Sequence, residues 1–299
     1  MTWKRVKELE LRPIPGKFDA AHLKETHRVI FQDCPRHGIT RYSPGEFRPP
    51  TPPDKLHSKN RPLEASHAHS YIGYSWMGAN EIKELDETLK TVDPKRLSRQ
   101  KPGAFAATVA ELYSRLDYIH PFLDGNSRTL RTFTRQLAKE SGFELDWTRF
   151  NQTPKSRDGL YIARDRAVNE ISMTRLPECE QKFKMYDSIH QFEKRPGMKE
   201  LLLEAIRPAR AVAFEKLPER DALKAYPELV RAYATLFDAE KYFQTKFLGQ
   251  PQSRYQASKQ VNERVQALLD AGEVENFQGG KRTRATPRKK TRIEPDRAQ

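Results

Sequence analysis

Residues 120–131 read HPFLDGNSRTLR, and no other stretch of the chain places so many reactive side chains so close together. The stretch begins with a histidine, His120, and has a carboxylate four residues later, Asp124. An imidazole can take up a proton near neutral pH. A carboxylate suits a hard cation such as Mg²⁺, which proteins usually hold through one or two carboxylates together with substrate phosphates. These two residues therefore indicate chemistry on a phosphate ester.

The second half of the stretch is suited to binding anions. The small residues at 125–127, Gly-Asn-Ser, would present backbone N–H groups to a phosphate if they open a helix. Arg128 and Arg131 would then share one helix face and could bind successive phosphates. Each residue alone also has an ordinary role, since an aspartate can cap a helix and two arginines can form a solvated face. Only the combination favours an enzyme.

Two hydrophobic patterns flank this stretch and predict a helix on each side of it. Upstream, the spacing i, i+4, i+7, i+11 of a buried helix face is followed by Phe105, Val109, Leu112 and Leu116. Downstream, the same kind of pattern is followed by Leu130, Phe133 and Leu137, with Gly142 as a stop. The segment from His120 to Ser127 is therefore predicted to be a loop between two core helices, with Phe122 pointing inward as its anchor.

The stretch resembles the signature of the Fic family, HxFx(D/E)GN(G/K)RxxR, at every position except 127. Residues 16–33, GKFDAAHLKETHRVIFQD, resemble the first helix of that family, and GFELDW at 142–147 resembles the segment after the signature helix. A pattern with this many fixed positions is far more specific than a short glycine motif. The resemblance implies a mainly α fold, a Fic-type helical bundle with a small β-hairpin flap, and a Fic domain at residues 1–175.

Members of this family mostly transfer AMP from ATP to a hydroxyl side chain of a target protein and release pyrophosphate. The resemblance implies that His120 is the general base that takes the proton from the target hydroxyl. It also implies that Asp124 holds the Mg²⁺ that bridges the nucleotide phosphates. ATP is then the co-substrate, and catalysis consists mainly of positioning and charge neutralisation.

The resemblance assigns the remaining signature residues to the nucleotide phosphates. The amides around Gly125, Asn126 and Ser127, together with the Asn126 side chain, would cradle phosphate oxygens. Arg128 would hold the β-phosphate, and Arg131 would hold the γ-phosphate. The signature loop as a whole is therefore expected to be the nucleotide site.

Ser127 is the departure from the signature, since the family usually has glycine and sometimes lysine there. A positive φ at this position would cost a serine about 1 kcal/mol, but the tolerance of lysine indicates that no positive φ is required. We therefore expect activity to survive. Lysine at this position goes with members that phosphorylate, so phosphorylation or transfer of another nucleotide remains an alternative reaction. A binding protein without activity is a further alternative.

Between the first helix and the signature, residues 44–79 contain six prolines and then a strand-like aromatic run at 69–76, HSYIGYSW. A helix is predicted around Ile82, Leu85 and Leu89. The family has a β-hairpin flap at this place, which pairs with the target segment by edge-strand addition. We therefore place the flap at about 60–79. The residues expected to dock the target are Tyr71, Ile72, Gly73 and Tyr74. The alternative is that the run only covers the core.

Residues 176–278 are predicted to be a helical accessory region without a catalytic cluster. Apolar stripes are formed by Tyr226, Leu229, Val230, Tyr233, Leu236 and Phe237, and by Val261, Val265, Leu268 and Leu269. The net charge of the chain is +14, and residues 281–299 carry eight Lys or Arg against two acidic residues, which is +6. Residues 279–299 are therefore expected to be a disordered basic tail that could contact nucleic acid through phosphates or simply be solvated.

The remaining expectations concern partners and location. An inhibitory (S/T)xxxE(G/N) helix, which many family members carry, is not found in the sequence. The chain is therefore expected to be a bacterial toxin restrained by a separate small antitoxin, whose glutamate would pair with Arg131. Targets of relatives of this standalone type include type II topoisomerases, so such an enzyme is one candidate target. No apolar run approaches the roughly 18 residues of a membrane span, and the chain is expected to be cytoplasmic, without a membrane partner.

Overall fold

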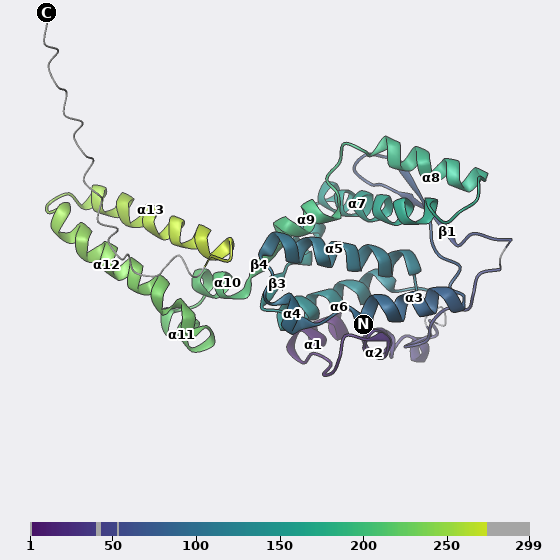
Figure 1. Ribbon diagram of the computed structural model, residues 1–299, viewed down its shortest axis with the longest axis horizontal. Coiled ribbons are helices and arrows are strands. Elements are labelled where there is room, and N and C mark those ends of the chain that lie inside the picture. Colours follow the sequence, from purple (N-terminus) through teal and green to yellow (C-terminus); the bar gives the residue numbers. More distant parts are fainter. Residues whose placement is uncertain (1, 40–42, 53, 274–299) are drawn as a thin grey trace, which may run out of the picture.

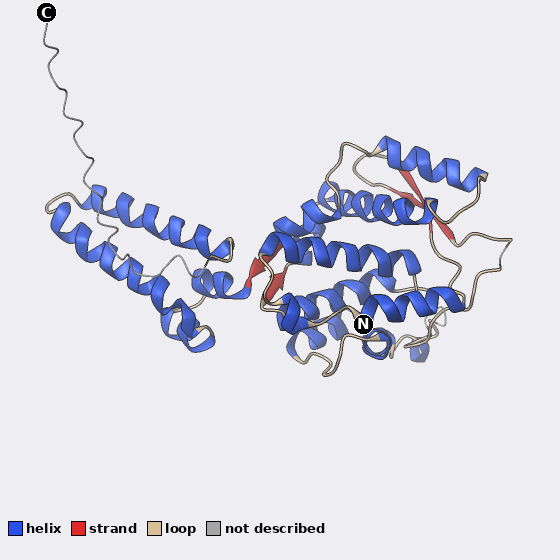
Figure 2. Cartoon of the chain, in the orientation of Figure 1, coloured by secondary structure: helices blue, strands red, loops and turns tan. Residues whose placement is uncertain are grey.

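The computed structural model describes residues 2–39, 43–52 and 54–273. Within these ranges the protein is mainly helical, with two small antiparallel sheets of two strands each, which confirms the expected fold class (Figures 1 and 2). The expected basic tail at 279–299 lies outside the described residues. Over the described ranges, no helix has both the length and the apolar content that crossing a membrane requires.

The elements follow one another from an N-terminal helical body to a smaller C-terminal helical body (Figure 1). The first part consists of α1 (Thr2–Leu11), α2 (Ala20–Phe31), η1 (Pro35–His37), β1 (Ser58–Pro62), β2 (His69–Gly73), α3 (Ala79–Lys90), α4 (Pro94–Leu97), α5 (Pro102–Ile119) and α6 (Asn126–Glu140). The second part consists of β3 (Phe143–Leu145), η2 (Trp147–Asn151), α7 (Pro154–Met173), α8 (Glu180–Gln191), α9 (Met198–Ala205), β4 (Ile206–Pro208), α10 (Ala209–Lys216), α11 (Glu219–Ala225), η3 (Pro227–Leu229), α12 (Val230–Lys246) and α13 (Pro251–Asp270).

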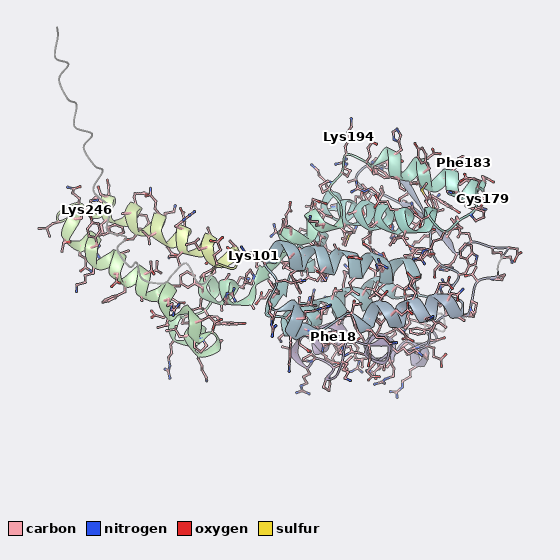
Figure 3. The ribbon with its side chains drawn as sticks, in the orientation of Figure 1. Phe18, Lys101, Cys179, Phe183, Lys194 and Lys246 are labelled. Atoms are coloured by element: carbon pink, nitrogen blue, oxygen red, sulfur yellow. The ribbon has the colours of Figure 1, made fainter. Side chains whose placement is uncertain are left out.

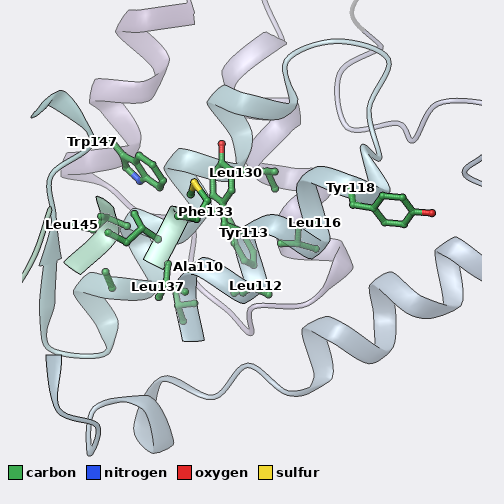
Figure 4. Close-up of a cluster of buried hydrophobic side chains, with 14 of the residues drawn as sticks. Ala110, Leu112, Tyr113, Leu116, Tyr118, Leu130, Phe133, Leu137, Leu145 and Trp147 are labelled. Carbon is green, nitrogen blue, oxygen red and sulfur yellow. The ribbon is translucent and has the colours of Figure 1, made fainter. Parts of the chain in front are cut away.

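The two helices predicted on either side of the signature are α5 and α6, and they form the centre of the core. The predicted buried face of α5 is at most 6% exposed, and the predicted face of α6 is fully buried. Figure 4 shows Leu112, Leu116, Leu130, Phe133 and Leu137 in one cluster with Trp147. Pro102 is the first residue of α5, a position where proline loses no hydrogen bond. The apolar spacing thus fixes both helices, and it also fixes the loop between them.

The loop is shorter than expected, because α6 already begins at Asn126. Residues 120–125 therefore join the two helices. Phe122 is fully buried, as predicted. At its other end α6 stops at Glu140, and Gly142 follows with a φ of 78°, the left-handed conformation that favours glycine.

The predicted β-hairpin is present, with different bounds. Its strands are β1 and β2, paired antiparallel from Ser58–Gly73 to Pro62–His69, so it begins before residue 60 and ends at residue 73. β1 is largely exposed, whereas β2 packs against α7 and α8. The hairpin therefore has one covered strand and one outer strand.

Buried polar side chains of α7 attach the hairpin to the helical body. The Asp158 carboxylate accepts hydrogen bonds from the backbone N–H groups of Glu64 and Ala65 in the turn, at 3.1 and 2.6 Å. The Asn169 amide accepts from Gly73 N–H at 3.2 Å and donates to the Tyr71 carbonyl at 2.8 Å. These contacts occupy the outer edge of β2 with side-chain groups, so the hairpin is held at its turn and along its second strand.

Packing places the end of the first body later than the expected boundary at residue 175. α9 packs on α5, and Met198, Leu202 and Ile206 belong to the same hydrophobic cluster as the signature helices. β4 pairs with β3 directly after this. The second cluster begins at Ala211 in α10 and continues to Leu269 in α13. The separate helical unit therefore starts near residue 209, and only the C-terminal part of the expected accessory region is separate.

In this second body, α12 and α13 lie side by side (Figure 1). Leu229, Val265 and Leu269 are buried there, as their stripes predict. Two members of the predicted stripe on α12 face solvent instead, since Val230 is 56% and Phe237 is 71% exposed. Phe183 of α8 is among the exposed aromatic residues (Figure 3).

Replacing Asn169 with alanine should lower the free energy of unfolding by about 1–3 kcal/mol, because the buried Gly73 N–H and the Tyr71 carbonyl lose their partner. Urea unfolding followed by circular dichroism measures this change. The matched control is Asn60→Ala on the exposed strand β1, which should stay within about 0.5 kcal/mol of the parent protein. Equal losses in both variants would show that Asn169 does not hold the hairpin.

Candidate active site

A cavity of about 500 Å³ lies between the signature loop, the hairpin and α7. Its lining includes every residue that the signature assigned to catalysis, metal or phosphate: His120, Asp124, Gly125, Asn126, Ser127, Arg128 and Arg131. It also includes Tyr74, one of the residues expected to dock the target. The other lining residues, which the sequence did not single out, are His57, Ser58, Lys59, Arg61, Leu123, Tyr161 and Arg164. Its size is in the range that small-molecule sites usually have.

His120 caps the C-terminal end of α5 in the left-handed conformation, with a φ of 50° and a ψ of 59°. A residue other than glycine seldom adopts this conformation, and the surroundings must hold it there. Arg48 does so, since its guanidinium donates to the His120 carbonyl at 2.8 Å and to the Ser75 carbonyl at 2.6 Å. The bend turns the chain away from the helix axis and brings the imidazole to the cavity.

The His120 ring is mostly buried, with 17% of the side chain exposed, and lies against the Tyr74 ring at a centroid distance of 3.9 Å. Its Nδ1 lies 3.3 Å from the Asp117 carbonyl, which can only accept, so Nδ1 carries the proton and Nε2 keeps its lone pair. Burial, with the nearby His57 and Arg48, holds the pKa of His120 well below its usual range. The imidazole is therefore neutral at pH 7, the form that a base requires.

The imidazole of His27, in α2, packs against the signature loop. Its ring stacks on Phe122 at 3.9 Å, with an angle of 5° between the planes. Its Nδ1 accepts from Gly45 N–H at 3.0 Å, so Nε2 bears the proton and donates to the Asp124 carbonyl at 3.1 Å. Burial lowers the pKa of His27 to about 4, which keeps this arrangement neutral. Nothing in the sequence pattern links His27 to the loop.

Asn126 has a different role from the one that the resemblance implies for its side chain. The amide Oδ1 accepts from Phe122 N–H at 3.0 Å, and Nδ2 donates to the Phe122 carbonyl at 2.7 Å. Both polar atoms thus close the loop on itself, and the side chain is 98% buried. The Asn126 side chain therefore shapes the loop and offers the cavity no side-chain donor.

The first turn of α6 presents backbone donors to the cavity. Gly125 precedes the helix with a φ of 85°, and a Cβ atom there would lie 2.4 Å from the Phe31 ring. The N–H groups of Asn126 and Ser127 have no acceptor among the described residues. Ser127 itself is helical and does not have a positive φ, so a serine causes no backbone strain there. A helix start of this kind is suited to an anion.

The two signature arginines reach the cavity from successive turns of α6. Arg131 donates from Nε to the Ser127 carbonyl at 3.2 Å, and no ion pair to a carboxylate is found for it within the described ranges. Arg128 lies 4.7 Å from the centre of the Phe31 ring and donates to the Thr2 hydroxyl at 3.0 Å. The guanidinium of Arg131 is thus available to an anion in the cavity.

The loop carboxylate, Asp124, is the one acidic side chain in the cavity lining. Its Oδ1 accepts from Gly125 N–H at 2.6 Å. Groups of three or more His, Cys, Asp or Glu that could enclose a metal are not found in the part of the chain that the structure describes. A single carboxylate beside a phosphate cradle fits Mg²⁺, which keeps water and substrate phosphates as its other ligands.

Comparison with known families gives a direct match to this region. Residues 17–138, which begin just before α2 and end in the last turn of α6, match the model of the Fic/DOC family. The chain contains a Fic/DOC domain. The signature loop and α2, the helix in the segment that resembles the first helix of the family, lie inside the matched residues, as their resemblance predicted.

Two curated relatives match about half of this chain. The protein adenylyltransferase VbhT of Bartonella schoenbuchensis is 29% identical over 157 residues, which are 51% of this chain and 28% of VbhT. A protein adenylyltransferase of Bartonella henselae is 30% identical over 152 residues, which are 49% of this chain and 26% of that protein. The similarity therefore spans only about a quarter of either relative.

Solved Fic structures are similar at lower identity. A Bartonella tribocorum BepC structure with bound AMPPNP is 20% identical, with a TM-score of 0.46, and the match covers 69% of this chain and 83% of that chain. The N-terminal Fic domain of a Bartonella quintana protein with bound ADP is 21% identical, with a TM-score of 0.44, over 69% and 81% of the two chains.

Two buried ion pairs involve residues of α7, which lies outside the matched segment, and the sequence did not predict them. Arg164 binds the Asp117 carboxylate, and Asp165 binds Arg61 of β1. Both pairs lie beside the cavity. The sequence does carry a signal for them, since three adjacent charged residues, Arg164, Asp165 and Arg166, interrupt an otherwise apolar stretch, YIARDRAV at 161–168. It does not show which residues they pair with.

The hairpin of the Fic/DOC domain places the expected docking residues on its inner strand and just after it. Ile72 and Tyr74 are buried, and Tyr74 lies against His120. The free edge of β2 is taken by Asn169 and by Ser188, whose hydroxyl accepts from Tyr71 N–H at 2.9 Å. Residues 71–74 therefore have no free edge for another strand, and the edge that remains open belongs to β1.

Gly125→Ala should destabilise the domain by about 1–3 kcal/mol more than Gly142→Ala, as measured by urea unfolding. Both glycines have a positive φ, so both variants bear the conformational cost of about 1–2 kcal/mol. Only at Gly125 does the new Cβ meet a neighbour, the Phe31 ring, because nothing lies within 4 Å at Gly142. In a Phe31→Leu background the excess should shrink, and an unchanged excess would contradict the proposed steric cause.

Proposed function

We propose that this chain is a protein adenylyltransferase, which transfers AMP from ATP to a hydroxyl side chain of a target protein and releases pyrophosphate. The observation that carries the proposal is the cavity itself, where a neutral imidazole faces a phosphate cradle and a carboxylate. The names of the two curated relatives support the same reaction.

The cradle side of the cavity would hold the nucleotide. The N–H groups of Asn126 and Ser127 would donate to phosphate oxygens, and Arg131 would bind the terminal phosphate. Arg128, which the Phe31 ring holds in place, would bind the β-phosphate. Asp124 would hold Mg²⁺, which supplies neutralisation of the phosphate charge when it is bound.

His120 would act on the target. The target hydroxyl gives its proton to Nε2, while its oxygen forms a bond to the α-phosphorus of ATP. The bond from that phosphorus to the bridging oxygen breaks, and pyrophosphate leaves with the electron pair. Since Nδ1 already bears a proton, His120 becomes an imidazolium and then loses the proton to water.

The outer strand β1 would bind the target backbone. Tyr71 and Gly73 direct their backbone N–H groups toward Ser188 and Asn169. The backbone groups of Ser70 and Ile72 therefore face β1. Alternation then directs the backbone groups of Ser58 and Asn60 outward. An extended target segment that adds to this edge would lie beside the cavity that His57, Ser58 and Lys59 line.

Restraint by a separate antitoxin is proposed for the same site. The string most similar to (S/T)xxxE(G/N) is TRLPEC at 174–179. It lies after the end of α7 and is not helical, so its glutamate is not in a helix. Arg131 would then pair with a glutamate of a small partner protein, and the chain would be a toxin. A type II topoisomerase is the candidate target, and the basic tail at 281–299 is a candidate contact for nucleic acid.

His120→Ala should reduce label transfer from α-³²P-ATP to lysate proteins by at least about 100-fold, because the base is lost. The assay contains the purified chain, Mg²⁺ and a bacterial lysate. The control variant is His69→Ala, which alters an exposed histidine of β2 and should retain activity. Transfer of label from γ-³²P-ATP alone would instead indicate phosphorylation, and full activity of His120→Ala would remove His120 from the reaction.

The rate of transfer should be insensitive to pH between about 7 and 8 and should fall only on the acid side, below pH 6.5. The active form is the neutral imidazole, so activity is present above the pKa of His120 and is lost as the pH falls through it. Burial depresses that pKa, which moves the loss to lower pH than for an exposed histidine. A plot of kcat/KM against pH measures this, and a half-maximal rate at pH 7 would contradict it.

A further inference from the structure

Two adjacent residues in the middle of α7, Arg164 and Asp165, are 3% and 2% exposed and carry opposite charges. Arg164 forms a two-pronged pair with Asp117 of α5, with nitrogen–oxygen distances of 2.8 to 3.1 Å. Asp165 forms a similar pair with Arg61 of β1, at 2.8 and 3.1 Å. Buried charges are costly unless they are paired, so each pair fixes its two elements together.

The pair with Asp117 lies directly behind His120. Asp117 is one helical turn earlier in α5, and its carboxylate oxygen lies 3.8 Å from His120 Nδ1. Its carbonyl lies 3.3 Å from the same nitrogen. The other pair, with Arg61, has no contact with His120 among those found in the described residues.

Arg164 also reaches the other end of the signature loop. Its Nη1 lies 3.4 Å from the hydroxyl oxygen of Ser127, at the start of α6. Ser127 is the departure from the family signature, and a glycine there would offer no side-chain acceptor. One guanidinium therefore contacts the end of α5 through Asp117 and the start of α6 through Ser127.

We propose that Arg164 is a positioning residue of the active site, which neutralises Asp117 beside His120 and braces Ser127 at the start of the phosphate cradle. The role in catalysis rests on the proposed function. The electrostatic role rests only on the geometry of the three residues.

The proposed role of Arg164 depends on the charged groups that surround His120. His120 is faced by Asp117 from α5, Arg164 from α7, and Arg48 and His57 from the segment before β1, with Tyr74 against its ring. Asp117 is the acidic group among these. Without Arg164 its full negative charge would lie within 4 Å of the imidazole and favour the protonated form, which cannot act as a base.

The first test measures the protonation of His120 by NMR, from the shift of its imidazole ¹³Cε1–¹H signal against pH. The signal is assigned by its absence in His120→Gln. Arg164→Met should raise the pKa of His120 by about one pH unit or more. Arg164→Met combined with Asp117→Asn should bring it back toward the parent value, because the unpaired carboxylate is gone.

The matched control is Arg61→Met, which leaves an equally buried carboxylate, Asp165, on the same helix. It should destabilise the protein to a similar degree while leaving the pKa of His120 unchanged. If Arg164→Met does not fold, Arg164→Gln, which removes the charge but keeps a polar group, should show the same rise. An unchanged pKa in the folded Arg164 variants, or an equal rise in Arg61→Met, would overturn the proposal.

The second test uses the transfer assay with α-³²P-ATP. The acid limb of kcat in Arg164→Met should move to higher pH by the amount that NMR measures, and Asp117→Asn in the same protein should reverse the movement. A uniform loss of rate at every pH would show a purely structural role and contradict the proposal. If the parent protein transfers no label at all, the proposed function fails, whereas the NMR titration still decides the electrostatic role.

Discussion

The loop between α5 and α6 is closed at both ends by a residue with a positive φ, His120 at one end and Gly125 at the other. These two bends reverse the chain within residues 120–125, so that the end of one core helix and the start of the next face the same cavity. The rest of the first body holds this turn in place. Arg48 binds the carbonyl at the first bend, and Phe31 fills the space that only a glycine leaves at the second.

Local patterns in the sequence were sufficient to predict the helices whose apolar residues recur at a regular spacing. The apolar spacing of Phe105 and Val109, and of Leu130 and Phe133, predicts α5 and α6, because a helix that packs on a core buries every third or fourth residue. The same spacing places the loop between them. The signature adds the residues that line the cavity, since a short loop brings together residues that are close in sequence.

Contacts between distant segments could not be predicted in this way. The sequence shows that Arg164 is charged and that its neighbours are apolar, but its partner Asp117 is 47 residues away and is chosen by packing. The side chain of Asn126 turns inward because the backbone of Phe122 needs both its groups, which is a property of the folded loop. The boundary near residue 209 was missed for a similar reason, since α9 has a short apolar pattern that only contact with α5 explains.

The hairpin shows how a covered strand and an open strand differ in what they can offer. β2 is fastened to α7 and α8, so β1 presents a fixed edge whose outward backbone groups belong to Ser58 and Asn60. Side chains along any strand alternate between its two faces. A guest strand on this edge would therefore turn only every second residue toward the imidazole. Binding through the backbone would thus depend little on the sequence of the added strand. It would allow modification only of residues at alternate positions along that strand.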